Sequence, residues 1–453
     1  MRRYVFLKVK GGVGGSSLAL SLGKFLALRG SKVLIVDADP VSTISELVGH
    51  KAKGIIQAIK ENLDYRTSLK TIETGKGTLT VLRIYSEGIP LEVEKRDLLS
   101  FKDKFSETYT RALNSENVDY VIVDHEAALS YEDPLFSIER KNFHETYKGI
   151  PEEIIIVLEP TPVSLSSTKR YIDALQAKEQ LPFSAIIVNK VPTDEETMTR
   201  AREILEEAME YSGAKVGALI PIINDYILYR PGAFTLYPIP VGVMEIALAL
   251  ERNKKIMYTP SHLDALKKAV YIRSTMLIET DSSNILKCIQ EILEVPKKIY
   301  SEEFKALIFS TQRFSTLIAE SSYVDYYGTT YSYEATKLKT GSVEEVIRLA
   351  KKLAQDFIRE IEADGTEKII VIASTNDLEP IYPSQEAPQL SRAFWKEFLE
   401  SLKHGTKNAS IILICEPIGA QCQALRGLVD IAVRAEYKDG LPKCIVLQSK
   451  IPG

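Results

Sequence analysis

The stretch that decides the fold is Lys10-Gly11-Gly12-Val13-Gly14-Gly15-Ser16-Ser17, which follows an apolar segment and precedes a helix-like one. Its glycines let the backbone curl so that successive N–H groups point inward. The amino end of the following helix adds partial positive charge, and a serine hydroxyl at the end of the run can bind Mg²⁺. The run therefore predicts a loop that binds a polyphosphate.

Apolar runs on both sides of this loop predict a parallel β-sheet. Six short runs are almost continuously apolar, which is typical of strands covered by helices on both faces: Tyr4–Val9, Lys32–Val36, Leu79–Ile84, Tyr120–Val123, Ile154–Leu158 and Ala185–Val188. Helix-like segments lie between them, among them Ser17–Arg29, Ser164–Lys178 and Thr197–Tyr211. We expect a doubly wound, mostly parallel α/β domain over residues 1–257, closed by a helix at Val243–Lys255.

The second half of the chain repeats this rhythm and predicts another α/β domain over residues 262–453. Its strand-like runs are Thr275–Ile278, Ala306–Phe309, Lys368–Ala373, Ser410–Cys415, Asp430–Arg434 and Lys443–Leu447. Lys438-Asp439-Gly440 predicts a hairpin between the last two, since Asp-Gly is a common tight-turn pair. We read the Tyr-, Gly- and Thr-rich stretch Tyr323–Tyr333 as a surface loop, with a base-stacking platform as the alternative. Trp395 is expected in the core.

The bulk composition indicates a globular protein without a membrane span. The chain has 453 residues and a formal net charge of -4, so it lacks a global basic field for nucleic acid. No run approaches the ~20 apolar residues that cross a bilayer. Lys8 and Lys10 interrupt the apolar N-terminus, which favours a buried strand over a signal peptide. We expect a cytoplasmic protein whose Cys288, Cys415, Cys422 and Cys444 are buried thiols.

The glycine-rich loop resembles the deviant Walker A motif of the ParA/MinD family, K-G-G-V-G-K-[ST]. Lys10 matches the family's signature lysine, and Ser16 matches its magnesium-binding hydroxyl. Gly15 stands where the family has a second lysine, which contacts the β- and γ-phosphates. The resemblance implies that Lys10, Gly11, Gly12, Val13, Gly14, Gly15, Ser16 and Ser17 bind ATP or ADP with Mg²⁺.

Two aspartate motifs extend this resemblance. Val33–Pro40 resembles the family's D-x-D-P strand, which implies that Asp39 positions the attacking water and that Asp37 lies near the metal. Asp119–Asp124 resembles Walker B, which implies that Asp124 holds Mg²⁺ through water. The usual D-T-P-P continuation is absent, because His125-Glu126-Ala127 follows.

Two later segments resemble the family's base-binding elements. Ala185–Val191 is similar to the strand whose asparagine, here Asn189, faces the adenine. Leu219-Ile220-Pro221, followed by Asn224-Asp225, is similar to the later base-contacting loop, which implies that Pro221 lies beside the base.

The glycine at position 15 predicts slow chemistry. Loss of a positioned cation at the γ-phosphate costs on the order of 10³-fold in rate, whereas binding is shared among many contacts. The family implies that Lys10 compensates by reaching a partner's phosphates across a homodimer. Lys8 is expected to point to another face and to contribute little.

The second domain has a looser resemblance to RecA/KaiC-type ATPase folds. Ser274–Asn284 stands where such a fold has its phosphate loop, but lacks G-K-[ST]. Ala373 occupies the place of the Walker B aspartate at the end of Lys368–Ser374, while Leu428–Arg434 and Cys444–Lys450 resemble closing strands. This resemblance implies a degenerate domain that does not bind nucleotide.

Three classes of function follow. The first is a ParA/MinD-like switch that closes as an ATP-bound homodimer and engages nonspecific DNA or a protein adaptor in partitioning or positioning. No basic amphipathic helix ends the chain, which disfavours the membrane version. The second is a non-catalytic scaffold built from two degenerate ATPase-like domains. The third is an amidoligase or a reductase component, and the absence of cysteine before residue 288 disfavours an iron–sulfur reductase.

Overall fold

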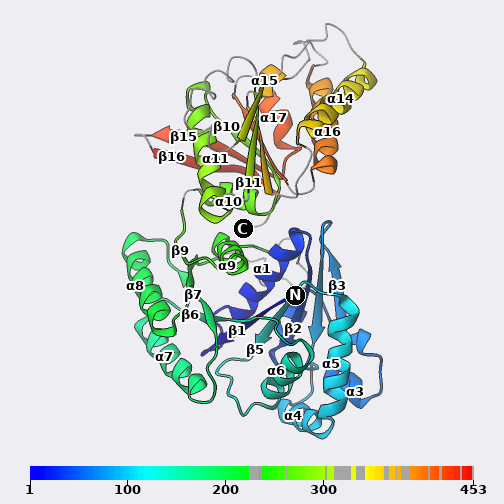
Figure 1. The fold of residues 1–453 in the computed structure, drawn as a ribbon, viewed down its shortest axis with the longest axis vertical. Helices are drawn as coiled ribbons and strands as arrows, with labels where there is room; N and C mark the ends of the chain where they lie inside the picture. The colour runs from blue at the N-terminus through cyan, green and yellow to red at the C-terminus, as the bar shows by residue number, and fades with distance from the viewer. Residues whose placement is uncertain are drawn as a thin grey trace. The chain divides into compact units, whose positions relative to one another are not determined.

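The computed structural model describes residues 1–223, 234, 237–261, 263–300, 304–310, 328–332, 342–361, 367–373, 375–378, 387–406, 409–417, 421–438 and 441–450. They form two compact units, Met1–Pro260 and Ser261–Ile451, here called the N-terminal and C-terminal units (Figure 1).

The N-terminal unit contains a 9-stranded sheet with the strand order β3-β4-β2-β5-β1-β6-β7-β8-β9. Only the β3–β4 pair is antiparallel among its neighbouring strands. The strands are β1 (Arg2–Lys8), β2 (Lys32–Ala38), β3 (Leu69–Glu73), β4 (Thr78–Arg83), β5 (Tyr120–His125), β6 (Glu152–Leu158), β7 (Phe183–Val191), β8 (Val216–Pro221) and β9 (Ile256–Tyr258). The order reverses around β1, and ligands of such sheets bind outside the carboxyl ends of the strands at this point.

Helices cover both faces of this sheet. Val5 and Leu7 of β1 belong to a core cluster with buried side chains of α5 (Lys102–Glu116), α6 (Pro134–Thr146), α7 (Pro162–Gln176) and α8 (Glu195–Ser212). Because side chains alternate along a strand, Tyr4 and Phe6 face the other way. On that face α1 (Gly15–Leu28) packs against the sheet and against α9 (Val241–Glu251). The predicted doubly wound, mostly parallel α/β fold is confirmed.

Shorter elements complete the unit. They are α2 (Thr43–Leu47), α3 (Ile55–Lys60), η1 (Tyr65–Ser68) and α4 (Leu91–Ser100). The closing helix is shorter than expected: α9 ends at Glu251, and residues 256–258 form the edge strand β9.

The C-terminal unit contains a 7-stranded sheet with the order β12-β11-β13-β14-β10-β15-β16. Its strands are β10 (Thr275–Glu279), β11 (Phe304–Ser310), β12 (Gly328–Ser332), β13 (Glu367–Ile372), β14 (Ala409–Cys415), β15 (Ile431–Lys438) and β16 (Leu441–Ser449). β15 and β16 pair antiparallel, with Lys438 opposite Leu441, which confirms the predicted hairpin. The other neighbouring strands are parallel.

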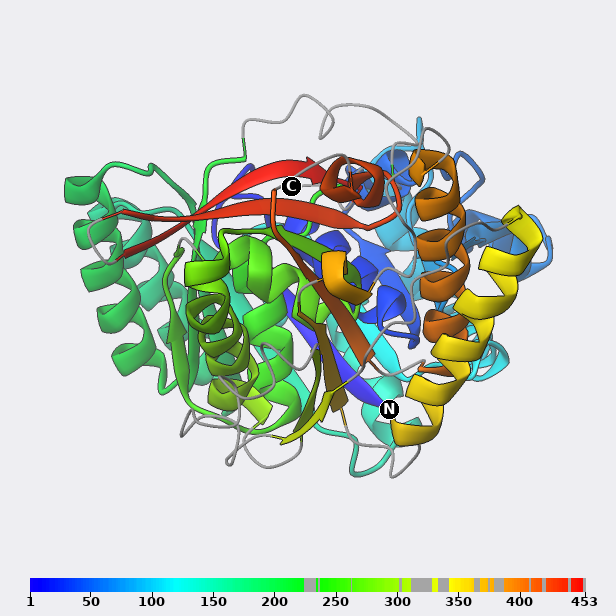
Figure 2. The same ribbon diagram turned by 90° about the horizontal axis from the view of Figure 1, so that it is seen from above.

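Helices of the C-terminal unit also pack against its sheet. They are α10 (Asp264–Tyr271), η4 (Ser282–Asn284), α11 (Ile285–Tyr300), α14 (Val343–Ile361), α15 (Thr375–Leu378), α16 (Ala387–Gly405) and α17 (Gln421–Arg426). Figure 2 shows α14 and α16 side by side, and their contacts are extensive. Trp395 of α16 lies in this core, as predicted.

Two expectations for this unit are wrong. Residues 328–332, assigned to a surface loop, form strand β12 beside β11. Threonine and tyrosine fit a pleated strand, and pairing with β11 decides their conformation. Cys415 and Cys422, expected as separate thiols, form a disulfide: Cys415 ends β14, Cys422 lies in the first turn of α17, and their Cα atoms are 5.9 Å apart. Cys288 is a buried thiol, as expected, whereas the side chain of Cys444 lies outside the described residues.

Among the described residues, no helix combines the length and the apolar character that a membrane span requires.

Candidate nucleotide-binding site

The glycine-rich loop joins β1 to α1 at the switch point of the N-terminal sheet. Gly12 and Gly14 have φ angles of +82° and +93°, which side-chain-bearing residues rarely adopt. A Cβ at Gly14 would also lie 2.3 Å from Nδ2 of Asn189, whereas one at Gly11 or Gly12 would meet nothing within 4 Å. The loop therefore requires glycine at Gly14 for both conformation and space.

The amino end of α1 follows directly from this loop. Gly14 caps the helix in a left-handed conformation, and the first turn carries no acidic side chain. The amides of Gly15, Ser16 and Ser17 belong to the first turn, whose N–H groups have no partner within a helix. Such amides and the helix dipole favour a bound anion.

Two side chains at the end of β7 donate hydrogen bonds to carbonyl groups of the loop. Nδ2 of Asn189 donates to the Val13 carbonyl at 2.8 Å. Lys190 donates to the Gly12 carbonyl and lies 3.2 Å from Glu159. Lys10 lies 3.5 Å from Glu159, with 73% of its side chain exposed. Loop carbonyls are thus fixed by the protein, while contact of Asn189 with a base stays a prediction.

The second predicted base-contacting segment is described only in part. Pro221 ends β8 and is half-buried. Asn224 and Asp225 lie outside the described residues, so the role of Pro221 also stays a prediction.

Two buried carboxylates lie near the carboxyl ends of β2 and β5, and β5 is the neighbour of β1. Asp37 of β2 and Asp124 of β5 are register partners, and both are fully buried. Oδ2 of Asp37 accepts bonds from the amide and the hydroxyl of Ser45, at 2.8 and 2.6 Å. Oδ1 of Asp37 and Oδ2 of Asp124 have no hydrogen-bond partner among the described residues. Burial raises the pKa of Asp37 to about 7 and also raises that of Asp124.

Lys8 points into this cluster, so its expected orientation is wrong. Its Nζ lies 2.8 Å from Asp124 Oδ1, 3.2 Å from Asp39 Oδ2 and 3.3 Å from Ser16 Oγ. Burial disfavours the ammonium, but Asp124 and Asp39 outweigh that cost and raise the pKa of Lys8. A Cβ at Gly15 would lie 2.7 Å from Cδ of Lys8. Lys8 therefore fills the space beside Gly15.

The donor set fits Mg²⁺ bound together with phosphates. Mg²⁺ prefers oxygen ligands and is commonly held by one or two carboxylates plus substrate phosphates. Ser16 and Asp124 both contact Nζ of Lys8, so their oxygens converge on one point. In the described part of the chain, no group of three or more His, Cys, Asp or Glu residues is arranged to hold a metal alone. A bound metal would need ligands from the nucleotide and water.

Asp39 lies at the mouth of this cluster. Its Oδ1 accepts the Val41 amide at 3.0 Å, and its Oδ2 faces Lys8. The carboxylate is mostly buried yet reachable, with 13% of its side chain exposed. This position suits a group that orients a water molecule next to a bound phosphate.

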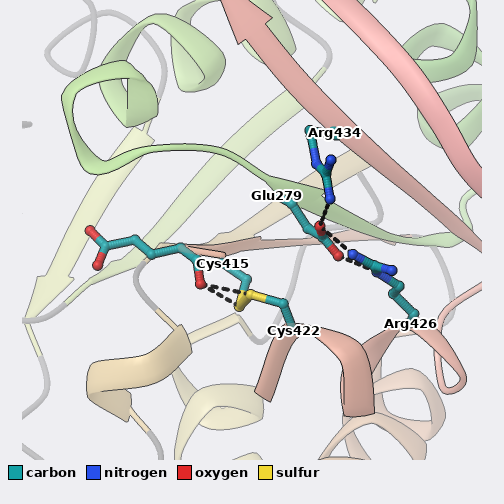
Figure 3. The surroundings of a disulfide bond; sticks show 6 residues. Glu279, Cys415, Cys422, Arg426 and Arg434 are labelled. Atoms are coloured by element: carbon teal, nitrogen blue, oxygen red, sulfur yellow. Dashed lines mark hydrogen bonds and ion pairs between the residues drawn. A yellow bond between two sulfur atoms is a disulfide. The ribbon is translucent and has the colours of Figure 1, made fainter. Parts of the chain in front are cut away.

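In the C-terminal unit, the strand end that corresponds to the end of β1 is the carboxyl end of β10, and its side chains are different. Glu279 ends β10, which lies between β14 and β15, and its carboxylate is fully buried. It pairs with Arg426, whose Nη2 donates at 2.7 Å, and with Arg434 at 3.5 Å (Figure 3). The Cys415–Cys422 disulfide lies nearby (Figure 3). This end of β10 presents a carboxylate where a phosphate loop presents amides.

Comparisons with known proteins concern the first half of the chain. Residues 4–227 match the CobQ/CobB/MinD/ParA nucleotide binding domain. An uncharacterized ATP-binding protein of Methanocaldococcus jannaschii is 24% identical, over 57% of this chain and 94% of its own. A probable plasmid-partitioning protein ParA of Thermus thermophilus is 25% identical, over 51% of this chain and 68% of its own. The MinD cell division protein of Aquifex aeolicus aligns at 20% identity with a TM-score of 0.42, over 57% of this chain and 100% of its own.

Proposed function

We propose that the N-terminal unit is a ParA/MinD-like switch that binds ATP with Mg²⁺ and hydrolyses it slowly or not at all. One observation carries this proposal: the open glycine loop before α1 lies beside Ser16 and Asp124, whose oxygens converge on a single cationic group. Amides for the phosphates and oxygens for the metal thus stand at one strand end.

The family match and the named relatives support this reading. The match covers the loop and both aspartate motifs, and two of the relatives are described as an ATP-binding protein and as a plasmid-partitioning protein. We infer that this chain also acts in partitioning or positioning. In this proposal ATP closes a homodimer, and the closed form engages nonspecific DNA or a protein adaptor.

The chemistry assigned to each residue follows from its place. Amides of Gly11 to Ser17 hold the phosphates, and Ser16 with Asp124 holds Mg²⁺, which neutralises phosphate charge. Asp37 lies on β2, next to Asp124 on β5, and stabilises the metal site through its Oδ1. Asp39 orients the attacking water, and exposed Lys10 reaches the partner's nucleotide. Hydrolysis is slow because Gly15 brings no cation to the γ-phosphate.

Calorimetry with Mg²⁺ and ATP tests the proposal. The wild type should bind, and Ser16→Ala should weaken binding when Mg²⁺ is present but have little effect in EDTA. Asp39→Ala should keep the affinity and abolish the residual phosphate release. Absence of binding heat for the wild type, with the fold verified by circular dichroism, would remove the nucleotide switch.

Light scattering and DNA titration test the later steps. Asp39→Ala with Mg²⁺ and ATP should elute as a dimer, whereas the nucleotide-free protein should not. If DNA is the partner, its affinity should fall steeply with salt because bound cations are released. A protein adaptor would leave DNA unbound, and a mass unchanged by ATP would contradict the switch.

The competing function is a non-catalytic scaffold. The side chains at the end of β10 favour this function for the C-terminal unit alone. We infer that this unit is a degenerate RecA/KaiC-like domain that binds no nucleotide. A buried carboxylate at the end of β10 repels phosphate, and both nearby arginines are already paired with it. If both units fail to bind ATP, the scaffold becomes the better reading.

A further inference from the structure

Lys8 is the cationic side chain that the loop motif does not predict and that the structure places inside the site. Its stem runs past Gly15, and its ammonium contacts Asp124, Asp39 and Ser16. Only 5% of the side chain is exposed. A lysine held this closely among the proposed magnesium ligands is too specific to be a solvated surface charge.

We propose that Lys8 supplies the phosphate-binding cation that Gly15 lacks, and that it moves from the carboxylates to the terminal phosphates when Mg²⁺ and ATP bind. This inference rests on the proposed nucleotide switch and concerns the cation for phosphate binding. Slow hydrolysis is still expected, because Lys8 is attached on β1 and not at residue 15, from which the second lysine of the resembled motif contacts the γ-phosphate. Lys8 thus has two positions: in the nucleotide-free protein it neutralises the carboxylates, and in the bound form it neutralises phosphate oxygens.

Electrostatics require the movement. The ammonium lies 2.8 Å from Asp124 and 3.3 Å from Ser16, the two residues that would hold Mg²⁺. A divalent cation bound by the same oxygens would repel the Lys8 ammonium strongly in a site with little water. Bound Mg²⁺ would neutralise the carboxylates, and Lys8 would find new partners in the phosphate oxygens. The flexible four-carbon stem of lysine permits this change.

Gly15 is what makes room for this arrangement. A Cβ at residue 15 would lie 2.7 Å from Lys8 Cδ and 3.6 Å from Lys8 Nζ. A side chain there would displace the Lys8 stem, and a lysine there would also bring a second ammonium to the same space. A lysine at position 15 and Lys8 in its observed place are therefore mutually exclusive.

Exchange of the lysine between the two positions tests the inference. We would measure the affinity for Mg²⁺–ATP and, separately, for ADP by calorimetry in wild type, Lys8→Met, Gly15→Lys and the double variant Lys8→Met/Gly15→Lys. Loss of a charged hydrogen bond predicts roughly 10- to 100-fold weaker ATP binding for Lys8→Met. The double variant should recover to within about threefold of wild type. Gly15→Lys alone should bind more weakly than the double variant.

A fourth variant, Gly15→Ala, covers the case in which Lys8→Met does not fold. Gly15→Ala keeps every charge and favours the helix, but its methyl group displaces the Lys8 stem, so it should also weaken ATP binding. Lys169→Met removes a lysine of α7 that pairs with Glu207 of α8, outside the site, and should bind as wild type. Circular dichroism verifies each fold before titration.

The outcomes separate this inference from the proposed function. If wild type binds ATP and either Lys8→Met or Gly15→Ala binds equally well, the role of Lys8 is refuted while the switch stands. Tighter binding by Lys8→Met would show that Lys8 only competes with Mg²⁺, which also refutes the role. If wild type binds no nucleotide, both proposals fall.

Discussion

Replacement of Gly14 by alanine isolates the contribution of the loop conformation to nucleotide binding. Gly14 has φ +93°, and an added Cβ would lie 2.3 Å from Nδ2 of Asn189. A left-handed alanine costs about 1–2 kcal/mol. Displacement of Asn189 also breaks its 2.8 Å hydrogen bond to Val13, worth about 1 kcal/mol net. The binding conformation of the loop should therefore become about 2–3 kcal/mol less favourable.

That energy corresponds to roughly 30- to 150-fold weaker binding, since 1.36 kcal/mol is a factor of ten. Calorimetry with Mg²⁺ and ATP measures the ratio directly. Gly75→Ala is the matched control, because Gly75 also has a positive φ, +81°, with nothing within 4 Å of its Cβ. The control should lose a little thermal stability and keep the affinity. Wild-type affinity in Gly14→Ala would refute the assignment of the loop as the phosphate site.

Three further predictions concern stability. Arg3→Met should lower the free energy of unfolding in urea by about 3–5 kcal/mol, because it leaves the buried Glu139 carboxylate without the guanidinium that contacts it at 2.6 and 2.7 Å. A loss below about 1 kcal/mol would contradict this expectation. Burial raises the pKa of Glu153 to about 7 from 4.5, so the stability that its neutral form contributes is present below pH 4.5 and lost as the pH rises through 7. Relative to wild type, Glu153→Gln should be more stable at pH 8 than at pH 5, and a pH-independent difference would refute the shift. Reduction of the Cys415–Cys422 disulfide should lower the stability of the C-terminal unit by about 2 kcal/mol in guanidinium unfolding. The double variant Cys415→Ala/Cys422→Ala should be insensitive to reductant, and an equal reductant effect on it would contradict the bridge.

The central strands of both sheets could be predicted because they are buried on both faces. β1 and β6 each contain a continuous apolar run, Tyr4–Leu7 and Ile154–Leu158, so both stand out from the sequence without knowledge of their neighbours. The edge strands could not. β3 is half-exposed along its length and β9 has only 3 residues, so neither has a distinctive pattern. Pairing with a neighbouring strand, rather than local preference, makes them strands.

The motifs single out Ser16, Asp39 and Asp124, and the structure brings all three around Lys8, while their roles in binding stay predictions. The orientation of Lys8 was predicted wrongly, although the alternation of side chains along β1 indicates it. Val5 and Leu7 pack into the cluster of α5 to α8, so Lys8 shares with Phe6 the face that α1 covers. The contact between Lys8 and Gly15 was not predictable, because it depends on how the loop returns the chain to the strand end.

The disulfide shows a related limit. Composition alone favours buried thiols in a chain with four cysteines. Cys415 ends β14 and Cys422 lies at the start of α17, and the spacing of these residues resembles no common motif. The disulfide depends on how a strand end and a helix start are placed in the fold, which single-residue preferences do not encode.

Gly15 has a different meaning once Lys8 is considered with it. Read along the chain, a glycine in place of lysine indicates a damaged phosphate loop. In the structure a Cβ at this position would meet the stem of Lys8, and that ammonium reaches the same carboxylate and hydroxyl oxygens that would hold the metal. Glycine as the first residue of α1 therefore leaves room for a buried lysine that comes from β1, and under the inference above Lys8 supplies the cation of the site in place of residue 15.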